Sequence, residues 1–167
     1  MYRTVEDFRK SMNSERENTL KVLRTLTDES LAQKVGPGGR SLGRLAWHIT
    51  QMFGEMGGQM HIPVEAASEK TPQPATAKDI ADAYESGSAS LIKGVEATWT
   101  DADLLVEIDM YGEKWARGYA LWGLIAHEIH HRGQMTVLMR QAGLEIPGLH
   151  GPARQEWAAF GMQPPAI

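Results

Sequence analysis

The chain has 167 residues, a size typical of one domain with a single core. Its 17 Lys and Arg residues stand against 21 Asp and Glu residues, and the net charge of -4 leaves no basic footprint for nucleic acid. The absence of cysteine excludes disulfides, zinc-thiolate sites and cysteine nucleophiles, so histidine and the carboxylates are the strong metal ligands that remain.

The N-terminus and the hydropathy pattern predict where the protein resides. The segment MYRTVEDFRK has no apolar signal-like region, and no stretch approaches the roughly 20 apolar residues of a membrane span. We therefore expect one domain over residues 1–167, located in the cytoplasm, with neither a membrane nor a nucleic acid as its partner.

Two amphipathic helices are predicted in the first third of the chain. Apolar residues recur mostly at spacings of three and four over residues 4–26, which indicates the first helix. After a GPGG loop at residues 36–39, Ser41 is a typical N-cap for a second helix. We expect that helix to fray near residues 57–58, which are both glycine.

The middle of the chain begins with a long connection. Residues 62–75 contain three prolines and are long enough to cross over between helices. Thr76, in the sequence TAKD, is a suitable N-cap for a third helix that ends near Thr98. Strand-like residues around YGE in residues 104–118 predict a short hairpin that leads into the last long helix.

The fourth helix is predicted from about Tyr119 to Gln141, with Gly143 as its C-terminal stop. Beyond it, Pro152 is suited to the first turn of a short helix that contains Trp157 and Phe160. These elements together predict an all-α fold: a four-helix bundle with a long connection between helices 2 and 3 and a short C-terminal helix.

Three of the six histidines lie in AHEIHHRGQ, residues 126–134. His127 and His131 are four residues apart, so on a helix they lie about 40° apart and one turn along the axis. Both imidazoles can therefore reach one ion. Leu124 and Leu138 fall on the same side of the helix, so the pair faces the apolar interior, where polar rings need partners.

A third ligand should come from another helix, because three protein ligands and an open position are typical of a catalytic metal site. His48, in RLAWHITQM, lies at the margin of the apolar stripe of the second helix and is the best candidate. Glu55 lies about 20° further round the same helix, two turns along, where it could complete the ligand set or act as a base. The predicted ligands are His48, His127 and His131.

The remaining histidines have less support as ligands. A lone inward histidine is more often a structural residue that is hydrogen-bonded within the core, and it is the pair at i and i+4 that favours a metal. His61 falls at a predicted helix end, and His130 projects about 60° from the direction of His127. His150 lies in a Pro- and Gly-rich tail and stays open as a residue at the rim of the site.

HEIHH also matches the HExxH pattern of zinc metalloproteases, in which the glutamate activates water on the metal. Gln134 and Val137 occupy the positions of the further glycine and histidine of the metzincins, which excludes that form. A thermolysin-like site would need Glu156 as a ligand and a cleft that nothing in the sequence predicts. Glu128 is the candidate catalytic residue of this less favoured hydrolase, although it points about 100° away from His127.

Taken together, LAWHI on the second helix, HEIHHRGQ on the fourth, the chain length and the long connection resemble the DinB/YfiT family, whose members are regarded as metalloenzymes. The resemblance covers nearly the whole chain. Its most specific part is H-x-x-x-H-R-G-Q, matched by residues 127–134, and the upstream histidine of the family is matched by His48.

The resemblance implies a four-helix bundle in which His48, His127 and His131 hold one divalent ion, most often zinc or nickel, with water in the open positions. It also implies homodimers, a small-molecule substrate and enzymes of the S-transferase and isomerase type that use bacillithiol, mycothiol or glutathione. A bound ion would lower the pKa of a thiol or water. A chain without cysteine would then obtain its nucleophile from the thiol cofactor. Glu55 and Glu128 are the candidate catalytic residues.

Three functions stay open on the sequence. The favoured one is a metal-dependent thiol transferase. The second is a metal-stabilised or metal-sensing protein with a closed shell of four ligands that includes Glu55 or His150. The third is a metal-free bundle that binds a small apolar ligand or a partner helix.

The side of the fourth helix opposite the histidines is also fairly apolar, with Trp122, Ile125 and Ile129. Such a helix should be covered on both sides. We expect the cover to be either the terminal segment with Trp157 and Phe160 or the second subunit of a homodimer.

Overall fold

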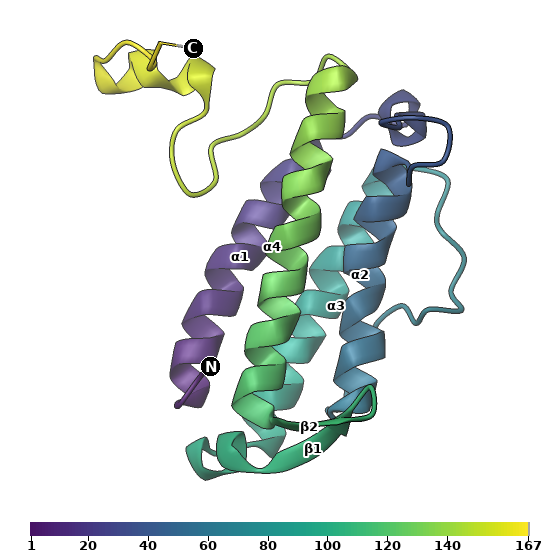
Figure 1. Cartoon of the computed structure of the whole chain (residues 1–167), viewed down its shortest axis with the longest axis vertical. Coiled ribbons are helices and arrows are strands. Elements are labelled where there is room, and N and C mark those ends of the chain that lie inside the picture. Colours follow the sequence, from purple (N-terminus) through teal and green to yellow (C-terminus); the bar gives the residue numbers. More distant parts are fainter. Residues whose placement is uncertain (167) are drawn as a thin grey trace.

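The computed structural model describes residues 1–166 and has four long helices: α1 (Val5–Thr25), α2 (Leu42–Gln59), α3 (Ala77–Thr98) and α4 (Arg117–Gln141). In Figure 1, α1 and α4 run in one direction along the bundle, and α2 and α3 run in the other. The pair α1 and α3, the pair α3 and α2, the pair α2 and α4, and the pair α4 and α1 are packed neighbours around one core. The prediction of an all-α four-helix bundle is confirmed. None of the helices in residues 1–166 has both the length and the hydropathy that crossing a membrane requires.

The predicted helix ends are confirmed at most positions. Ser41 and Thr76 cap α2 and α3 by accepting hydrogen bonds from backbone N–H groups three residues later. Gly143, with φ of 76°, takes the left-handed conformation just after α4. Two boundaries differ: α2 continues through the glycines at 57–58 to Gln59, and α4 begins two residues before Tyr119. Tertiary packing outweighs the low helix propensity of glycine there.

The connection over residues 60–76 crosses from the end of α2 to the start of α3, as predicted (Figure 1). It is held against α2 by polar contacts, one of which is the hydrogen bond from Trp47 Nε1 to the carbonyl oxygen of Thr71, at 3.0 Å. A Cβ at Gly54 would collide with the carbonyl oxygen of Ala67. Glycine at that position therefore allows the backbone of the connection to lie directly on α2.

A small hairpin closes one end of the bundle between the 3-10 helix η2 (Asp101–Leu105) and α4 (Figure 1). It consists of β1 (Glu107–Met110) and β2 (Glu113–Ala116), paired antiparallel, and confirms the predicted hairpin. The two turn residues, Tyr111 and Gly112, both have positive φ, at 56° and 86°. This is the geometry of a tight two-residue turn, and it strains a bulky side chain such as that of Tyr111.

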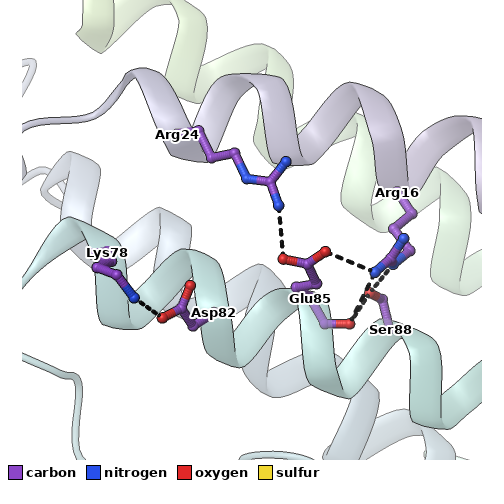
Figure 2. Close-up of polar contacts among 6 residues, drawn as sticks. All are labelled: Arg16, Arg24, Lys78, Asp82, Glu85 and Ser88. Atoms are coloured by element: carbon purple, nitrogen blue, oxygen red, sulfur yellow. Dashed lines mark hydrogen bonds and ion pairs between the residues drawn. The ribbon is translucent and has the colours of Figure 1, made fainter.

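Figure 2 shows the polar contacts that join α1 to α3 on the surface of the bundle. Glu85 on α3 accepts from Arg24 Nη2 at 2.7 Å and from Arg16 Nη2 at 3.3 Å. Arg16 also donates from Nε to the hydroxyl of Ser88 at 3.0 Å. Because these ion pairs are partly exposed, each contributes only about 0–1 kcal/mol to stability.

The chain also contains the 3-10 helix η1 (Glu29–Ala32) before α2, and it ends in a terminal segment with η3 (Arg154–Phe160). The predicted C-terminal helix is therefore a 3-10 helix, and Pro152 lies before it rather than in its first turn. The terminal segment does not cover the apolar side of α4, because Trp122 is 44% exposed, Ile129 is 38% exposed and Phe160 itself is 61% exposed. A second subunit on that side stays a prediction.

Candidate metal centre

The structure brings together the three histidines that the sequence singles out. His48 extends from α2, and His127 and His131 extend from α4. The Nε2 atom of His127 lies 3.1 Å from that of His48 and 3.0 Å from that of His131. One ligand atom from each residue falls within 4.8 Å of the others, a grouping of three that no other His, Asp or Glu residues make within residues 1–166.

Apolar packing between α2 and α4 sets this convergence. Each helix buries a stripe of large side chains in the common core: Leu45, Ile49 and Met52 on α2, and Leu124, Met135 and Leu138 on α4. The histidines lie at the edge of these stripes. His131 is 8% exposed, and His48 and His127 are partly buried. The rings are therefore held by the core while one side of the group stays open.

Burial and mutual repulsion keep these rings neutral. Burial is the largest cause that lowers the pKa of His48 and of His127 to about 4, and the charges of the neighbouring histidines and of Arg40 add to it. Burial also lowers the pKa of His131, and the hydrogen bond that His131 donates to Gln134 partly offsets this shift. Neutral imidazoles at physiological pH are the form that binds a metal ion.

Gln134 fixes the orientation of His131. Its amide Oε1 lies 2.8 Å from Nδ1 of His131, and its amide Nε2 lies 3.1 Å from Nε2 of His130. We assign the proton of His131 to Nδ1, because an amide oxygen only accepts hydrogen bonds. The lone pair of His131 Nε2 then points toward the other two rings.

The donor atoms fit a divalent cation. With the proton of His131 on Nδ1, a single proton can satisfy only one of the two Nε2 contacts of His127, and the other contact is left as two facing lone pairs. The buried Nδ1 of His127 also has no partner within residues 1–166. Facing lone pairs repel one another unless a cation lies among them. Imidazole nitrogen suits zinc and nickel among other ions, so the site agrees with the metal that the resemblance implies.

The other proposed ligands lie outside this group. Glu55 accepts a hydrogen bond from the Tyr111 hydroxyl at 3.2 Å, and His150 lies 2.9 Å from Arg132 on another side of α4. His61 is exposed at the end of α2 with φ of 57°. The hypothesis of a closed shell of four ligands through Glu55 or His150 therefore finds no support in the geometry.

Glu128 faces away from the histidines, and this corrects its candidacy as a catalytic residue. It is fully buried, and its Oε1 accepts from the hydroxyls of Thr19 on α1 and Tyr84 on α3. Burial raises its pKa above the ordinary value. Glu156 is bound by the backbone N–H groups of its own segment. The HExxH pattern is met in sequence alone, because its glutamate points into a different part of the core.

A second buried cluster, missed by the sequence reasoning, surrounds Arg132. This arginine is 1% exposed; it pairs with Glu15 at 2.5 Å and donates to the Thr19 hydroxyl at 2.9 Å. We call Glu15, Thr19, Tyr84, Glu128 and Arg132 the buried network. One signal for it was present in the sequence: Glu128 and Arg132 repeat the four-residue spacing of the histidines, one position later.

Two cavities adjoin the histidines. The first, of about 320 Å³, lies between α2, the hairpin and α4 and is lined by His48, Glu55, Met56, Tyr111, Trp115, Gly123 and His127. The second, of about 340 Å³, lies where the loop before α2 meets α4 and is lined by Val35, Gly39, Arg40, Leu45, His131, Gln134 and Leu138. A larger cavity, of about 540 Å³, lies between the connection and α3 and contains no histidine.

These cavities add residues that the sequence reasoning did not select. Tyr111 and Trp115 come from the hairpin, and Arg40 comes from the loop before α2. Tyr111 has a strained φ and lines the first cavity, and burial together with Glu55 raises its pKa to about 12. The Tyr111 hydroxyl is therefore a hydrogen-bond donor at neutral pH. Backbone strain retained beside a cavity is common at functional sites.

The sequence of this chain matches known proteins over its whole length. The DinB family model matches residues 1–165. YrdA of Bacillus subtilis (strain 168) is 42% identical over 167 residues, which cover 100% of both chains.

Solved structures give the same relationship. A DinB-like protein from Bacillus cereus ATCC 10987 is 43% identical with a TM-score of 0.85, and the match covers 89% of this chain and 99% of that chain. The DinB-like protein YjoA of Bacillus subtilis is 23% identical with a TM-score of 0.68, covers 86% of this chain and 96% of that chain, and supports the fold alone. The chain therefore belongs to the DinB family.

Proposed function

We propose that this protein is a divalent-metal-dependent enzyme that transfers a low-molecular-weight thiol of the bacillithiol, mycothiol or glutathione type to a small electrophile. The observation that carries the proposal is the convergence of three neutral histidine Nε2 atoms beside two cavities. Three protein ligands leave coordination positions free for a reactant, whereas structural zinc sites are closed by four.

His48, His127 and His131 would hold the ion, with zinc or nickel as the expected metals. A bound ion would supply Lewis acidity that lowers the pKa of a thiol, so that the thiol ionises at neutral pH. The residues around it have separate tasks. Gln134 keeps the His131 lone pair aimed at the centre, and the packing of α2 against α4 fixes the spacing of the rings.

The first cavity is the proposed place for the electrophile. Trp115 and Met56 supply apolar walls, and the Tyr111 hydroxyl can turn from Glu55 to donate its hydrogen bond to a developing negative charge. In the transfer the S–H proton leaves the thiol, a sulfur–carbon bond forms, and the leaving group departs with its bonding electrons. Glu55 lines the same cavity as His48 and His127, and we propose its carboxylate as the acceptor of that proton.

The test is a transfer assay with protein loaded with zinc or with nickel. Bacillithiol, mycothiol and glutathione would each be supplied with 1-chloro-2,4-dinitrobenzene, and thioether formation would be followed by mass spectrometry above the protein-free rate. We expect one thiol to be preferred, a loss of about 100-fold or more in His48→Ala, and about 10–100-fold in Glu55→Gln. His61→Asn is the matched control, because asparagine tolerates the positive φ of that exposed histidine.

Two results would overturn the proposal. Thioether formation that is equal in metal-loaded and metal-free protein would remove the metal from the reaction. A rate for His48→Ala equal to that of His61→Asn would remove the histidine centre from it.

A further inference from the structure

Arg40 is an exposed arginine in the loop before α2, beside the metal centre. It directly precedes Ser41, the N-cap of α2, and lines the second cavity together with His131. No carboxylate within residues 1–166 lies within ion-pair distance of Arg40. By contrast, Arg44, one turn further along, donates to the Gln51 side chain at 3.1 Å. The Arg40 guanidinium is thus free to bind a group that enters the cavity.

The side of the histidine group at the second cavity is positive. Arg40 and His131 line the second cavity, which no carboxylate within residues 1–166 lines, whereas Glu55 lines the first cavity. The N-terminal end of α2, with its partial positive charge, lies at the second cavity. A divalent ion held by three neutral imidazoles would leave this charge unbalanced. An anionic ligand would balance it.

We propose that the second cavity is the subsite for a carboxylate of the thiol reactant, with Arg40 as the residue that binds it. This rests on the proposed function and names the class of thiol: one whose sulfur and carboxylate belong to the same small molecule. The guanidinium offers paired N–H donors in the planar geometry that a carboxylate accepts.

The shape of the cavity suits such a ligand. It has about 340 Å³ of space, which is within the range of small-molecule sites. Val35, Leu45 and Leu138 supply apolar walls that would contact a short carbon chain. His131 lines the cavity on the side of the metal centre, and Arg40 supplies the charge. A ligand in this cavity would place its sulfur toward the histidines and its carboxylate toward the guanidinium.

The experiment uses protein loaded with cobalt(II), whose sulfur-to-cobalt absorption band reports binding of a thiol at the metal. Three probes separate the contributions: 3-mercaptopropionate has a thiol and a carboxylate, 2-mercaptoethanol has the thiol alone, and propionate has the carboxylate alone. Dissociation constants would be measured for the wild type and for Arg40→Gln. Arg44→Gln is the matched control, because Arg44 is close in sequence and does not line the cavity.

We expect Arg40→Gln to raise the dissociation constant of 3-mercaptopropionate by about 10-fold, which is the effect of one charge-assisted contact. The dissociation constant of 2-mercaptoethanol should change by less than about 2-fold. Arg44→Gln should change neither. Equal weakening of both thiols, or no change in either, would overturn the subsite while leaving the metal centre in place. Competition by propionate that is as strong as binding of 3-mercaptopropionate would also overturn it, because the carboxylate would then bind at the metal. A wild type that takes up no cobalt would instead remove the proposed function, and the subsite with it.

Discussion

Helix α4 carries two pairs of polar residues with the same spacing and opposite properties. His127 and His131 face α2, whereas Glu128 and Arg132, each one position later, face α1 and α3. Both pairs lie at the edge of or inside the core. Comparing the partners of the polar atoms in these two pairs therefore distinguishes a functional role from a structural one.

In the buried network, most polar atoms meet opposite or complementary partners; the exception is Oε2 of Glu128, which is buried without a partner within residues 1–166. The Arg132 guanidinium is matched by Glu15, Thr19 and His150, and Glu128 accepts two hydroxyl donors. In the histidine group, Nε2 atoms face one another, and no carboxylate within residues 1–166 is hydrogen-bonded to the three rings. Complementary pairing is what a folded core requires. Facing lone pairs beside two cavities require a ligand, which is why we assign function to the histidines.

The largest effect that this difference predicts is on stability. Arg132→Ala should lower the free energy of unfolding by about 3–5 kcal/mol, because it leaves Glu15 as an uncompensated buried charge. Urea unfolding followed by circular dichroism measures this. The matched control is Arg16→Ala at the half-exposed ion pair with Glu85, for which we expect about 0–1 kcal/mol. Equal losses in the two variants would contradict a structural role for the buried network.

The same two pairs show which features of the site can be predicted from the sequence. Spacing on a helix depends only on local geometry, so it correctly pairs His127 with His131, and the apolar stripe of α2 correctly selects His48. Direction is harder to predict. HExxH matches at Glu128, but the direction of that side chain within the core depends on its partners Thr19 and Tyr84, which are distant in sequence.

Residues in loops are also difficult to assign to the site from the sequence. Arg40 and Tyr111 line the cavities beside the histidines through the conformation of the loop before α2 and of the hairpin turn. Neither belongs to a periodic pattern, so no helical wheel brings them to the site. The crossover connection, by contrast, was predictable from its length and its prolines.

A smaller effect, on metal affinity, is expected for substitution of Gln134, which does not contact the buried network. Gln134→Ala removes the acceptor that orients His131, and it should weaken metal binding by about 10–100-fold while leaving the fold intact. Competition with a chromophoric chelator gives the affinity. Gln141→Ala, in the last turn of α4, is the control and should change the affinity by less than about 2-fold. An unchanged affinity in Gln134→Ala would show that the orientation of His131 is set by packing alone.

The smallest effect concerns acid sensitivity of the metal-free protein. His48 and His127 have a folded pKa of about 4, below the value of about 6.5 in an unfolded chain. Above pH 6.5 neither state binds protons at these rings. As the pH falls from about 6.5 to about 4, the unfolded chain takes up protons that the folded chain does not, so the free energy of unfolding decreases. Solvent screening of these partly exposed rings limits the loss to about 1 kcal/mol.

Unfolding in urea at pH 7.5 and at pH 5 would reveal this dependence. The double variant His48→Gln/His127→Gln should show less of it, because glutamine does not titrate. A pH dependence that is the same in the double variant and in the wild type would place the acid-sensitive groups elsewhere.

The most direct test of the central claim is the metal content of tag-free protein, determined by elemental mass spectrometry. We predict close to one zinc or nickel ion per chain in the wild type, and its loss in His48→Ala, His127→Ala and His131→Ala, whereas Arg40→Gln should retain it. Retention in any of the three histidine variants would break the proposed ligand set. A wild type that holds no metal and takes up neither added zinc nor added nickel would contradict the claim that these histidines form a metal centre.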